Sequence, residues 1–557
     1  MQESILLSYS GVLFSAYSDW FKHLISSPKK LLETSQECRC TFFRFVNYFW
    51  DVCHNKKCPK CININPVDHR FKDSLWSELY PFNLYSQLFL SYVHLLDYMS
   101  TNVPGVTPHN QHLVNFTLHQ LMDSFSPSNF PCTNPVVIKA ALRQSGMNFI
   151  QGYLNYFEDG FRKINHQSPV GTEEFKVGVT VGITPGKVIY RNKLIELIQY
   201  TPTTNKVFAE PILIVPAWIM KYYILDLSPY NSLVKFLVEK GHTVFMISWK
   251  NPASEDRNLG LDDYINFGIM DALKVVNSII PNQLVHCTGY CIGGTLLMLA
   301  AALMSSKADN RIKSITLFAA QIDFIDAGEL RLFIDEAQIQ TLEITMQEQG
   351  YLSGEQMASC FSALHAIDLI WSRYIQDYLL GTRYPLNDMM AWNHDVTRLP
   401  YRMHSEYLRK LYLNNELSMG KFKTNGVNIK LSAIKVPIFA VSTVKDHVAP
   451  WKSVYKIHKL INAETTYVLT GGGHNSGVIS EPGHKGRSYQ MLKREKLGKS
   501  LMPEEWLEQA PKYVGSWWLS WEQWLADLSV VQVTLPTTGN NDYKIIGNAP
   551  GTYVLQR

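Results

Sequence analysis

The sequence of 557 residues has little charge, because Asp, Glu, Lys and Arg make up only 18% of it. Its net charge is +4 and it contains no long basic run, whereas a protein that binds nucleic acid usually carries a basic domain or stripe. We therefore expect no nucleic-acid partner. Hydrophobic residues make up 46%, so the chain can bury a large core and does not have the composition of a disordered protein.

The sequence also lacks the marks of secretion and of membrane insertion. Its first 20 residues contain no basic segment and no small-residue cleavage site, and its nine cysteines are an odd, unevenly placed set. We expect a cytoplasmic protein with reduced thiols. The run between Lys274 and Lys307 has no charged residue and could span a bilayer by length. Pro281 and a cluster of glycines interrupt it, which predicts a buried strand, a turn and a buried helix instead of a transmembrane span.

The pattern of the sequence changes twice along the chain. Residues 1–67 leave two interpretations open: a helix packed on the next domain, or an interfacial helix on a hydrophobic surface. Residues 68–175 predict a mainly helical domain. Residues 176–557 alternate short apolar strands with helices, which predicts an α/β catalytic domain with a parallel sheet. Residues of about 322–430 interrupt this alternation with helical, aromatic sequence and predict a cap inserted over the site.

A predicted strand-to-helix turn carries the candidate nucleophile. The strand NQLVHCTGY leads into Gly289-Tyr290-Cys291-Ile292-Gly293-Gly294 and then into a helix, which is the context of the nucleophile elbow G-x-S-x-G with Cys in place of Ser. The helix N-terminus behind Cys291 would favour the thiolate form, and the Ile292 N–H would be one oxyanion donor. The alternative is a structural cysteine on a glycine-rich turn. We interpret Cys287, within the strand, as core packing.

Two later strands end beside a candidate acid and a candidate base. Asp446 follows VPIFAVSTV and His474 follows TTYVLT, in the order nucleophile, acid, histidine that is typical of α/β-hydrolases. Both residues fall at the carboxyl ends of strands, where ligands bind in open α/β sheets. We predict that His474 takes the thiol proton and that Asp446 orients the imidazole. His447, next to Asp446, is the competing base.

Together, these motifs resemble the polyhydroxyalkanoate synthases, and the class I enzymes best, from about Asp68 to the C-terminus. The resemblance rests on the nucleophile box GYCIGGT and on the segments DHRFKDSLW, IVPAWIMKYYILDLSPYNSLVKFLVEKGHTVFMISWKNP, WNHDVTRLP, LYLNNEL, KDHVAPW, GGGHNSGVIS, GSWWLSWEQWL and APGTYV. It implies an α/β-hydrolase fold with a helical cap insertion and a mainly helical N-terminal domain.

The resemblance also implies a function, an acyltransferase that polymerises (R)-3-hydroxyacyl-CoA, typically 3-hydroxybutyryl-CoA, and releases CoA. By the same resemblance Cys291 is the acylated nucleophile, His474 the base and Asp446 the third catalytic residue. The backbone of Ile219 would be a second oxyanion donor, in a loop where Trp218 replaces the smaller residue or cysteine that is more frequent in the family.

The partners that this resemblance implies are the hydroxyacyl-CoA, the growing polyester chain, the granule surface, granule-associated proteins and a second copy in a homodimer. It places the protein in the cytoplasm at polyhydroxyalkanoate granules. No cofactor is expected, because CoA is part of substrate and product.

Two other functions are compatible with the same residues. A thioesterase or polyester hydrolase would pass the acyl group from the same triad to water. A non-catalytic granule-coating protein would retain the site as a relic. The sequence also leaves open whether His474 or Asp446 activates the incoming hydroxyl group.

The N-terminal segment contains five of the cysteines, and they leave a separate question. The pair Cys58 and Cys61 forms a CxxC motif that a second pair could complete into a zinc site; the other members are Cys38, Cys40, Cys53 and His54. Against zinc, the spacing of Cys38 and Cys40 makes a poorer chelate. A redox pair or incidental cysteines are the alternatives, and no metal is expected at the catalytic site.

Overall fold

The computed structural model describes residues 2–54, 59–63, 68–364, 366–529 and 531–557. The chain divides into two compact units, one of Met1–Val170 with Ser359–Pro385 and one of Gly171–Ala358 with Leu386–Arg557. The segment 359–385, from the middle of the expected cap, therefore belongs to the N-terminal unit, while 322–358 and 386–430 belong to the unit with the sheet. The linear domain boundaries inferred from the sequence stay predictions.

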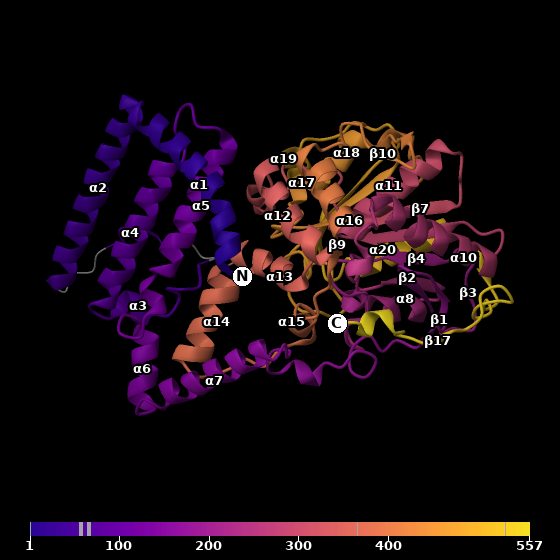
Figure 1. Cartoon of the computed structure of the whole chain (residues 1–557), viewed down its shortest axis with the longest axis horizontal. Helices are drawn as coiled ribbons and strands as arrows, with labels where there is room; N and C mark the ends of the chain where they lie inside the picture. The colour runs from indigo at the N-terminus through magenta and orange to yellow at the C-terminus, as the bar shows by residue number, and fades with distance from the viewer. Residues whose placement is uncertain (1, 55–58, 64–67, 365, 530) are drawn as a thin grey trace. The chain divides into compact units, whose positions relative to one another are not determined.

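The first unit is built of helices (Figure 1). Helix α1 packs on α5, where the Tyr17 hydroxyl lies 2.9 Å from Thr117 Oγ1 and Asn110 donates to Asp19 over 2.7 Å. These contacts support the first interpretation of the N-terminal segment, a helix packed on the next domain. The helices of this unit are α1 (Gln2–Ile25), α2 (Pro28–Cys53), α3 (Leu75–Glu78), α4 (Phe82–Ser100), α5 (Pro108–Ser124), α6 (Pro135–Arg143), α7 (Met147–Ile164) and α14 (Ser372–Tyr374).

Polar contacts on one face of α7 bring the distant segment 359–385 into this unit. Asn148 donates to Leu379 O over 2.7 Å, and Asn155 donates to Asp377 O over 2.8 Å. At Gly152 a Cβ atom would lie 1.8 Å from the carbonyl oxygen of Tyr378, so only glycine permits this approach of the two backbones. Side-chain amides thus satisfy carbonyl groups of a segment that is more than 200 residues away in the sequence.

The second unit contains an eleven-stranded sheet with the order β15-β14-β13-β12-β7-β6-β4-β5-β2-β1-β17. The six strands from β13 to β5 run parallel, and antiparallel strands extend the sheet on both sides. Strands β6, β12 and β13 are buried along their whole length, as continuous apolar strands of a parallel sheet are. The strands are β1 (Gly186–Arg191), β2 (Ile195–Tyr200), β4 (Ile212–Val215), β5 (Val244–Trp249), β6 (Val285–Tyr290), β7 (Ile312–Phe318), β12 (Ile438–Thr443), β13 (Thr465–Thr470), β14 (Ser488–Arg494), β15 (Lys512–Val514) and β17 (Gly547–Asn548).

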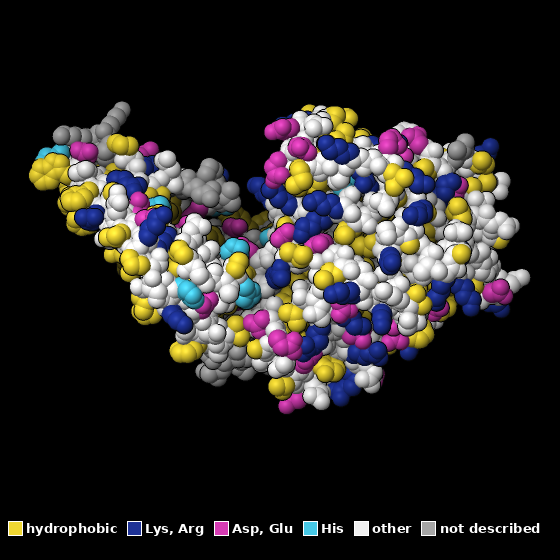
Figure 2. Space-filling view, turned by 90° about the horizontal axis from the view of Figure 1, so that it is seen from above, with side chains coloured by type: hydrophobic (Ala, Val, Ile, Leu, Met, Phe, Trp, Pro, Cys, Tyr) yellow, Lys and Arg dark blue, Asp and Glu magenta, His cyan; other side chains and the backbone are white. Residues whose placement is uncertain are grey.

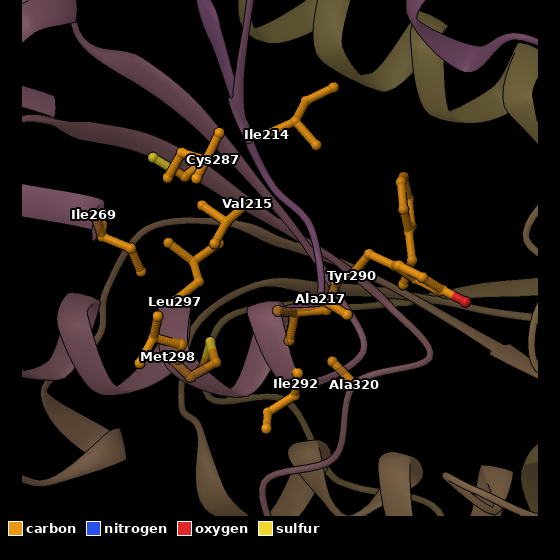
Figure 3. Close-up of a cluster of buried hydrophobic side chains, with 14 of the residues drawn as sticks. Ile214, Val215, Ala217, Ile269, Cys287, Tyr290, Ile292, Leu297, Met298 and Ala320 are labelled. Carbon is orange, nitrogen blue, oxygen red and sulfur yellow. The ribbon is translucent and has the colours of Figure 1, made fainter. Parts of the chain in front are cut away.

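Helices cover the sheet and confirm the predicted α/β architecture. Helices α10 (Asp271–Ile279) and α11 (Ile292–Ser306) pack on β4, and Figure 3 shows Leu297 and Met298 of α11 beside Val215. Helices α8 (Leu233–Glu239) and α20 (Trp518–Leu528) contact each other through Phe236 and Trp518, whose ring centroids are 5.5 Å apart. Further helices of this unit are α12 (Glu336–Gln349), α15 (Asp388–Trp392), α16 (Tyr401–Glu406), α17 (Trp451–Tyr455), α18 (Ile457–Leu460) and α19 (Pro503–Gln509), and helix α13 (Gly354–Leu364) contains residues of both units.

The uncharged run between Lys274 and Lys307 forms the end of α10, strand β6 and the whole of α11, which includes the predicted strand, turn and helix. Within the described ranges of the chain, no helix has both the length and the apolar character needed to cross a bilayer.

Candidate active site

Cys291 occupies a strained turn between strand β6 and helix α11. Its φ angle is +53° with ψ at −128°, a backbone conformation that is uncommon for a residue with a side chain and recurs at functional sites. The Cys291 N–H donates to Phe318 O on the neighbouring strand over 2.8 Å. The turn therefore has the features of a nucleophile elbow, with the thiol at the carboxyl edge of the parallel strands.

Three glycines make this turn sterically possible. An added Cβ would lie 2.4 Å from Gly294 Cα at Gly289, 2.4 Å from the carbonyl oxygens of Val215 and Pro216 at Gly293, and 2.5 Å from Ala320 Cβ at Gly294. All three distances are below 3.0 Å, which real Cβ atoms essentially never show. The spacing of glycines in the sequence motif thus follows from close approach of backbones.

His474 and Asp446 form a hydrogen-bonded pair next to the elbow. Asp446 follows strand β12, His474 follows strand β13, and His474 Nδ1 lies 2.8 Å from Asp446 Oδ2. The side chain of Asp446 is fully buried and that of His474 is 10% exposed. Asp446 Oδ1 accepts the N–H groups of Val448 and Ala449 over 3.0 and 2.8 Å, so the carboxylate is held from both sides.

The charges in this pair stabilise each other. Burial opposes the charged imidazole, but the Asp446 carboxylate and the Cys291 side chain outweigh this effect and hold the pKa of His474 well above its usual range. Burial likewise opposes the carboxylate, but His474 and the two backbone N–H groups keep the pKa of Asp446 below its usual value. His474 is also hydrogen-bonded to the Cys291 side chain. Because Nδ1 faces Asp446, the nitrogen that faces the thiol is Nε2.

The candidate oxyanion donors lie on two neighbouring segments. Ile292 is the first residue of α11, where an N–H group has no acceptor within the helix. The loop Pro216–Ile219 follows β4 and passes against the start of α11, as the close contacts at Gly293 show. Figure 3 shows Ala217 of this loop close to Ile292. The two backbone N–H groups of Ile292 and Ile219 thus belong to segments that touch.

Trp218 does not enter the site with its side chain. It is 2% exposed, and its ring lies 5.5 Å from the ring of Trp249 and 4.7 Å from that of Tyr264, centroid to centroid. The residue that departs from the family pattern therefore fills the core behind the loop, so the larger side chain alters the packing of this core.

Two other sequence candidates have different surroundings. His447 is partly buried, and the Asp446 carboxylate next to it in the sequence bonds to His474. Cys287 is fully buried, which raises the pKa of its thiol to about 12. It therefore stays protonated and packs in the core (Figure 3).

Three residues near the triad were missed by sequence reasoning. The Tyr290 hydroxyl donates to Asn475 Oδ1, and the Tyr290 ring lies 5.7 Å from the His474 ring, so this pair connects the elbow to the histidine loop. Tyr407 is buried, and burial, Tyr412 and the nearby Cys291 hold the pKa of its phenol well above the usual value. Tyr290 and Asn475 lie inside recognised motifs, whereas Tyr407 lies in the expected cap, where no sequence motif indicates that it is near the active site.

The N-terminal cysteines belong to the helical unit. Cys38, Cys40 and Cys53 belong to α2, and Cys61 follows it; Cys58 lies outside the described residues. Among the residues that the structure describes, no group of three or more His, Cys, Asp or Glu side chains is placed to hold a metal ion. A zinc site of this kind would need Cys58, and it stays one of the three interpretations that the sequence leaves open.

A cysteine at the elbow and a His–Asp pair at the carboxyl edge of this sheet define a protein of the α/β-hydrolase class with cysteine at the nucleophile position. The family model "alpha/beta hydrolase fold" matches residues 210–479 and confirms the predicted fold. The model "Poly-beta-hydroxybutyrate polymerase (PhaC) N-terminus" matches residues 67–237.

Curated relatives define the family more narrowly. The chain is 38% identical over 496 residues to the poly(3-hydroxyalkanoate) polymerase of Methylorubrum extorquens, covering 88% of this chain and 81% of that one. It is 35% identical over 495 residues to the poly(3-hydroxyalkanoate) polymerase subunit PhaC of Cupriavidus necator, covering 87% and 83%. The subunit PhaC of Rhizobium meliloti is 35% identical and is matched over 96% of this chain and 87% of its own. The chain belongs to the poly(3-hydroxyalkanoate) polymerase family, as the sequence motifs predicted.

Proposed function

We propose that this enzyme polymerises (R)-3-hydroxyacyl-CoA, with 3-hydroxybutyryl-CoA as its main substrate, through an acyl thioester on Cys291. The observation that carries the proposal is the continuous hydrogen-bonded series from Cys291 through His474 to Asp446 at the elbow. Membership of the polymerase family supplies the substrate class and the polyester product.

The first half-reaction exchanges one thioester for another. The Cys291 thiolate attacks the thioester carbonyl, the negative charge passes to the carbonyl oxygen beside the N–H groups of Ile292 and Ile219, and the bond to CoA sulfur breaks. The CoA thiolate takes the proton held by His474. The step is nearly balanced in free energy, because the bond formed and the bond broken are of the same kind.

The second half-reaction elongates the polyester. A 3-hydroxyl group attacks the acyl thioester on Cys291, its proton passes to His474, a C–O ester bond forms, and the C–S bond to Cys291 breaks. We assign the proton transfer to His474, because Asp446 already accepts hydrogen bonds on both oxygens, from Val448 and Ala449 on one and from His474 on the other. Neither step requires a cofactor.

We further propose the granule surface in the cytoplasm, together with a second copy of the chain and granule-associated proteins, as the setting of the reaction. Support comes from the exposed apolar face of α2, formed by Phe42, Phe43, Val46, Phe49 and Trp50. Figure 2 shows several hydrophobic groups on the visible surface of the helical unit. Exposed apolar patches of this kind are typical of interaction surfaces.

The experiment measures CoA release from 3-hydroxybutyryl-CoA and isolates the acyl product, for the wild type and for Cys291→Ala. Cys287→Ala is the matched control, because it removes a neighbouring thiol that is buried in the core. Thiol release with insoluble polyester, lost in Cys291→Ala and kept in Cys287→Ala, is the expected result. Release with free hydroxybutyrate alone would indicate the hydrolase, and no release at all would favour the non-catalytic coat protein.

A further inference from the structure

Two sequence motifs that the chemistry above does not use converge on the candidate oxyanion loop. The segment Trp392–Arg398, from the motif WNHDVTRLP, lies alongside the residues that follow Pro216. Met220 and Val396 form an antiparallel β-bridge, and Trp392 Nε1 donates to Lys221 O over 2.8 Å. We name residues 392–398 the oxyanion strap.

One contact of the strap bears directly on the oxyanion donor. The Thr397 hydroxyl donates to the carbonyl oxygen of Trp218 over 2.6 Å, and Thr397 is only 5% exposed. That carbonyl belongs to the same peptide group as the Ile219 N–H. Because a peptide group is planar and its C=O and N–H point in opposite directions, a hydrogen bond that fixes the Trp218 carbonyl also fixes the direction of the Ile219 N–H.

We propose that Thr397 is a positioning residue that orients the Ile219 N–H toward the oxyanion formed during acyl transfer. The proposal rests on the proposed function of Cys291. An oxyanion hole is effective because its donors are oriented before charge develops. A free peptide group in a loop can rotate away, and the Thr397 hydroxyl opposes this rotation from the face of the loop that carries the carbonyl.

The strap is itself held at several points within the same unit. The Tyr223 hydroxyl donates to Asp395 over 3.0 Å, and the Arg398 N–H donates to Asn251 Oδ1 over 2.9 Å. These bonds keep Thr397 at a fixed position relative to the loop.

The terminal motif APGTYV anchors the residues that complete this arrangement. The N–H groups of Thr552 and Tyr553 donate to the buried carboxylate of Glu196 over 2.8 and 2.9 Å. Gln556 follows this motif. Its backbone oxygen accepts a hydrogen bond from the Lys221 ammonium group over 2.6 Å, and its side-chain Oε1 accepts one from the Asn251 backbone N–H over 3.0 Å. The C-terminal residues therefore fix both the loop, through Lys221, and the strap, through Asn251.

The test compares Thr397→Val, which keeps the shape of the side chain and removes the hydroxyl, with Thr397→Ser, which keeps the hydroxyl. We expect Thr397→Val to lower kcat for CoA release by roughly 10- to 100-fold with little change in KM, and Thr397→Ser to stay within a few-fold of the wild type. Alkylation of Cys291 by iodoacetamide, followed by peptide mass spectrometry, should proceed at the same rate in all three proteins. This substitution at a saturated carbon forms no oxyanion, so it reports the Cys291–His474 pair alone.

Each outcome decides between a positioning role and a structural one. A wild-type kcat in Thr397→Val would overturn the proposal, as would an alkylation rate that falls by the same factor as kcat. If Thr397→Val unfolds, Thr397→Ala, which adds no methyl group in place of the hydroxyl, is measured against Thr397→Ser in the same two assays. Absence of CoA release from the wild type, with Cys291 still alkylated, would refute the proposed function and with it the role of Thr397; equal activity of wild type and Thr397→Val refutes only the latter.

Discussion

The substitution Gly293→Ala tests whether close contact between helix α11 and the oxyanion loop sets the catalytic rate. An alanine Cβ would lie 2.4 Å from the carbonyl oxygens of Val215 and Pro216, whereas ordinary van der Waals contact begins at 3.4 Å. The two segments must therefore separate by about 1 Å. Because the obstacles are backbone atoms, no side-chain rotation can relieve the contact. A misplacement of about 1 Å can cost roughly 100-fold in rate, so we expect kcat for CoA release to fall by that order.

The same substitution should leave the protein folded. Overpacking of a core costs about 1–3 kcal/mol, which corresponds to a fall in Tm of roughly 1–4 °C for a unit as large as the one that contains the sheet. The matched control is Gly547→Ala, where an added Cβ meets no atom within 4 Å; it should retain both kcat and Tm. A Gly293→Ala enzyme with wild-type kcat would refute the argument that this contact positions the oxyanion donors.

Three further predictions concern titratable groups of the sheet unit. Asp446→Asn removes the charge that fixes His474 and should lower kcat by roughly 10³- to 10⁴-fold; a loss below tenfold in CoA release would contradict this role. Iodoacetamide should label Cys291 and leave Cys287 unmodified in the folded protein, because burial raises the pKa of the Cys287 thiol to about 12; peptide mass spectrometry checks this. Burial, with smaller effects of His242 and Lys313, lowers the pKa of His286 to about 3. Between about pH 6.5 and pH 3, His286 therefore binds a proton in the unfolded state but not in the folded state. Its contribution should lower the free energy of unfolding by about 1.4 kcal/mol for each pH unit that the pH falls in this range. Urea unfolding at pH 7 and pH 5 should show a smaller loss in His286→Gln, and an unchanged loss would contradict the assignment.

The sequence could predict the parts of the site that depend on local geometry. The elbow requires glycines beside Cys291 because backbones approach there, so the requirement appears as a short motif. Asp446 and His474 follow buried strands, and the carboxyl ends of parallel strands meet at one edge of the sheet. The mutual position of these three residues thus follows from strand order once the sheet is recognised.

The rest of the arrangement depends on contacts between distant segments, which a single sequence does not display. The segment 359–385 joins the helical unit because Asn148 and Asn155 donate to its carbonyl groups, and an amphipathic pattern does not reveal such a choice. Tyr407 approaches Cys291 from a segment more than 100 residues further along the chain, so no spacing rule connects the two. The motif around Thr397 was recognised, but only the fold assigns the hydroxyl an acceptor.

Trp218 shows why a departure from the family pattern can leave the chemistry intact. Its side chain and its backbone contact different parts of the protein. The indole packs on Trp249 and Tyr264 in the core, while the carbonyl oxygen accepts a hydrogen bond from the Thr397 hydroxyl. The group that would face the substrate, the Ile219 N–H, belongs to the backbone and has the same chemistry whatever side chain precedes it. A larger residue at this position is therefore accommodated by the core on one side of the loop, provided that the strap on the other side keeps the peptide plane in place.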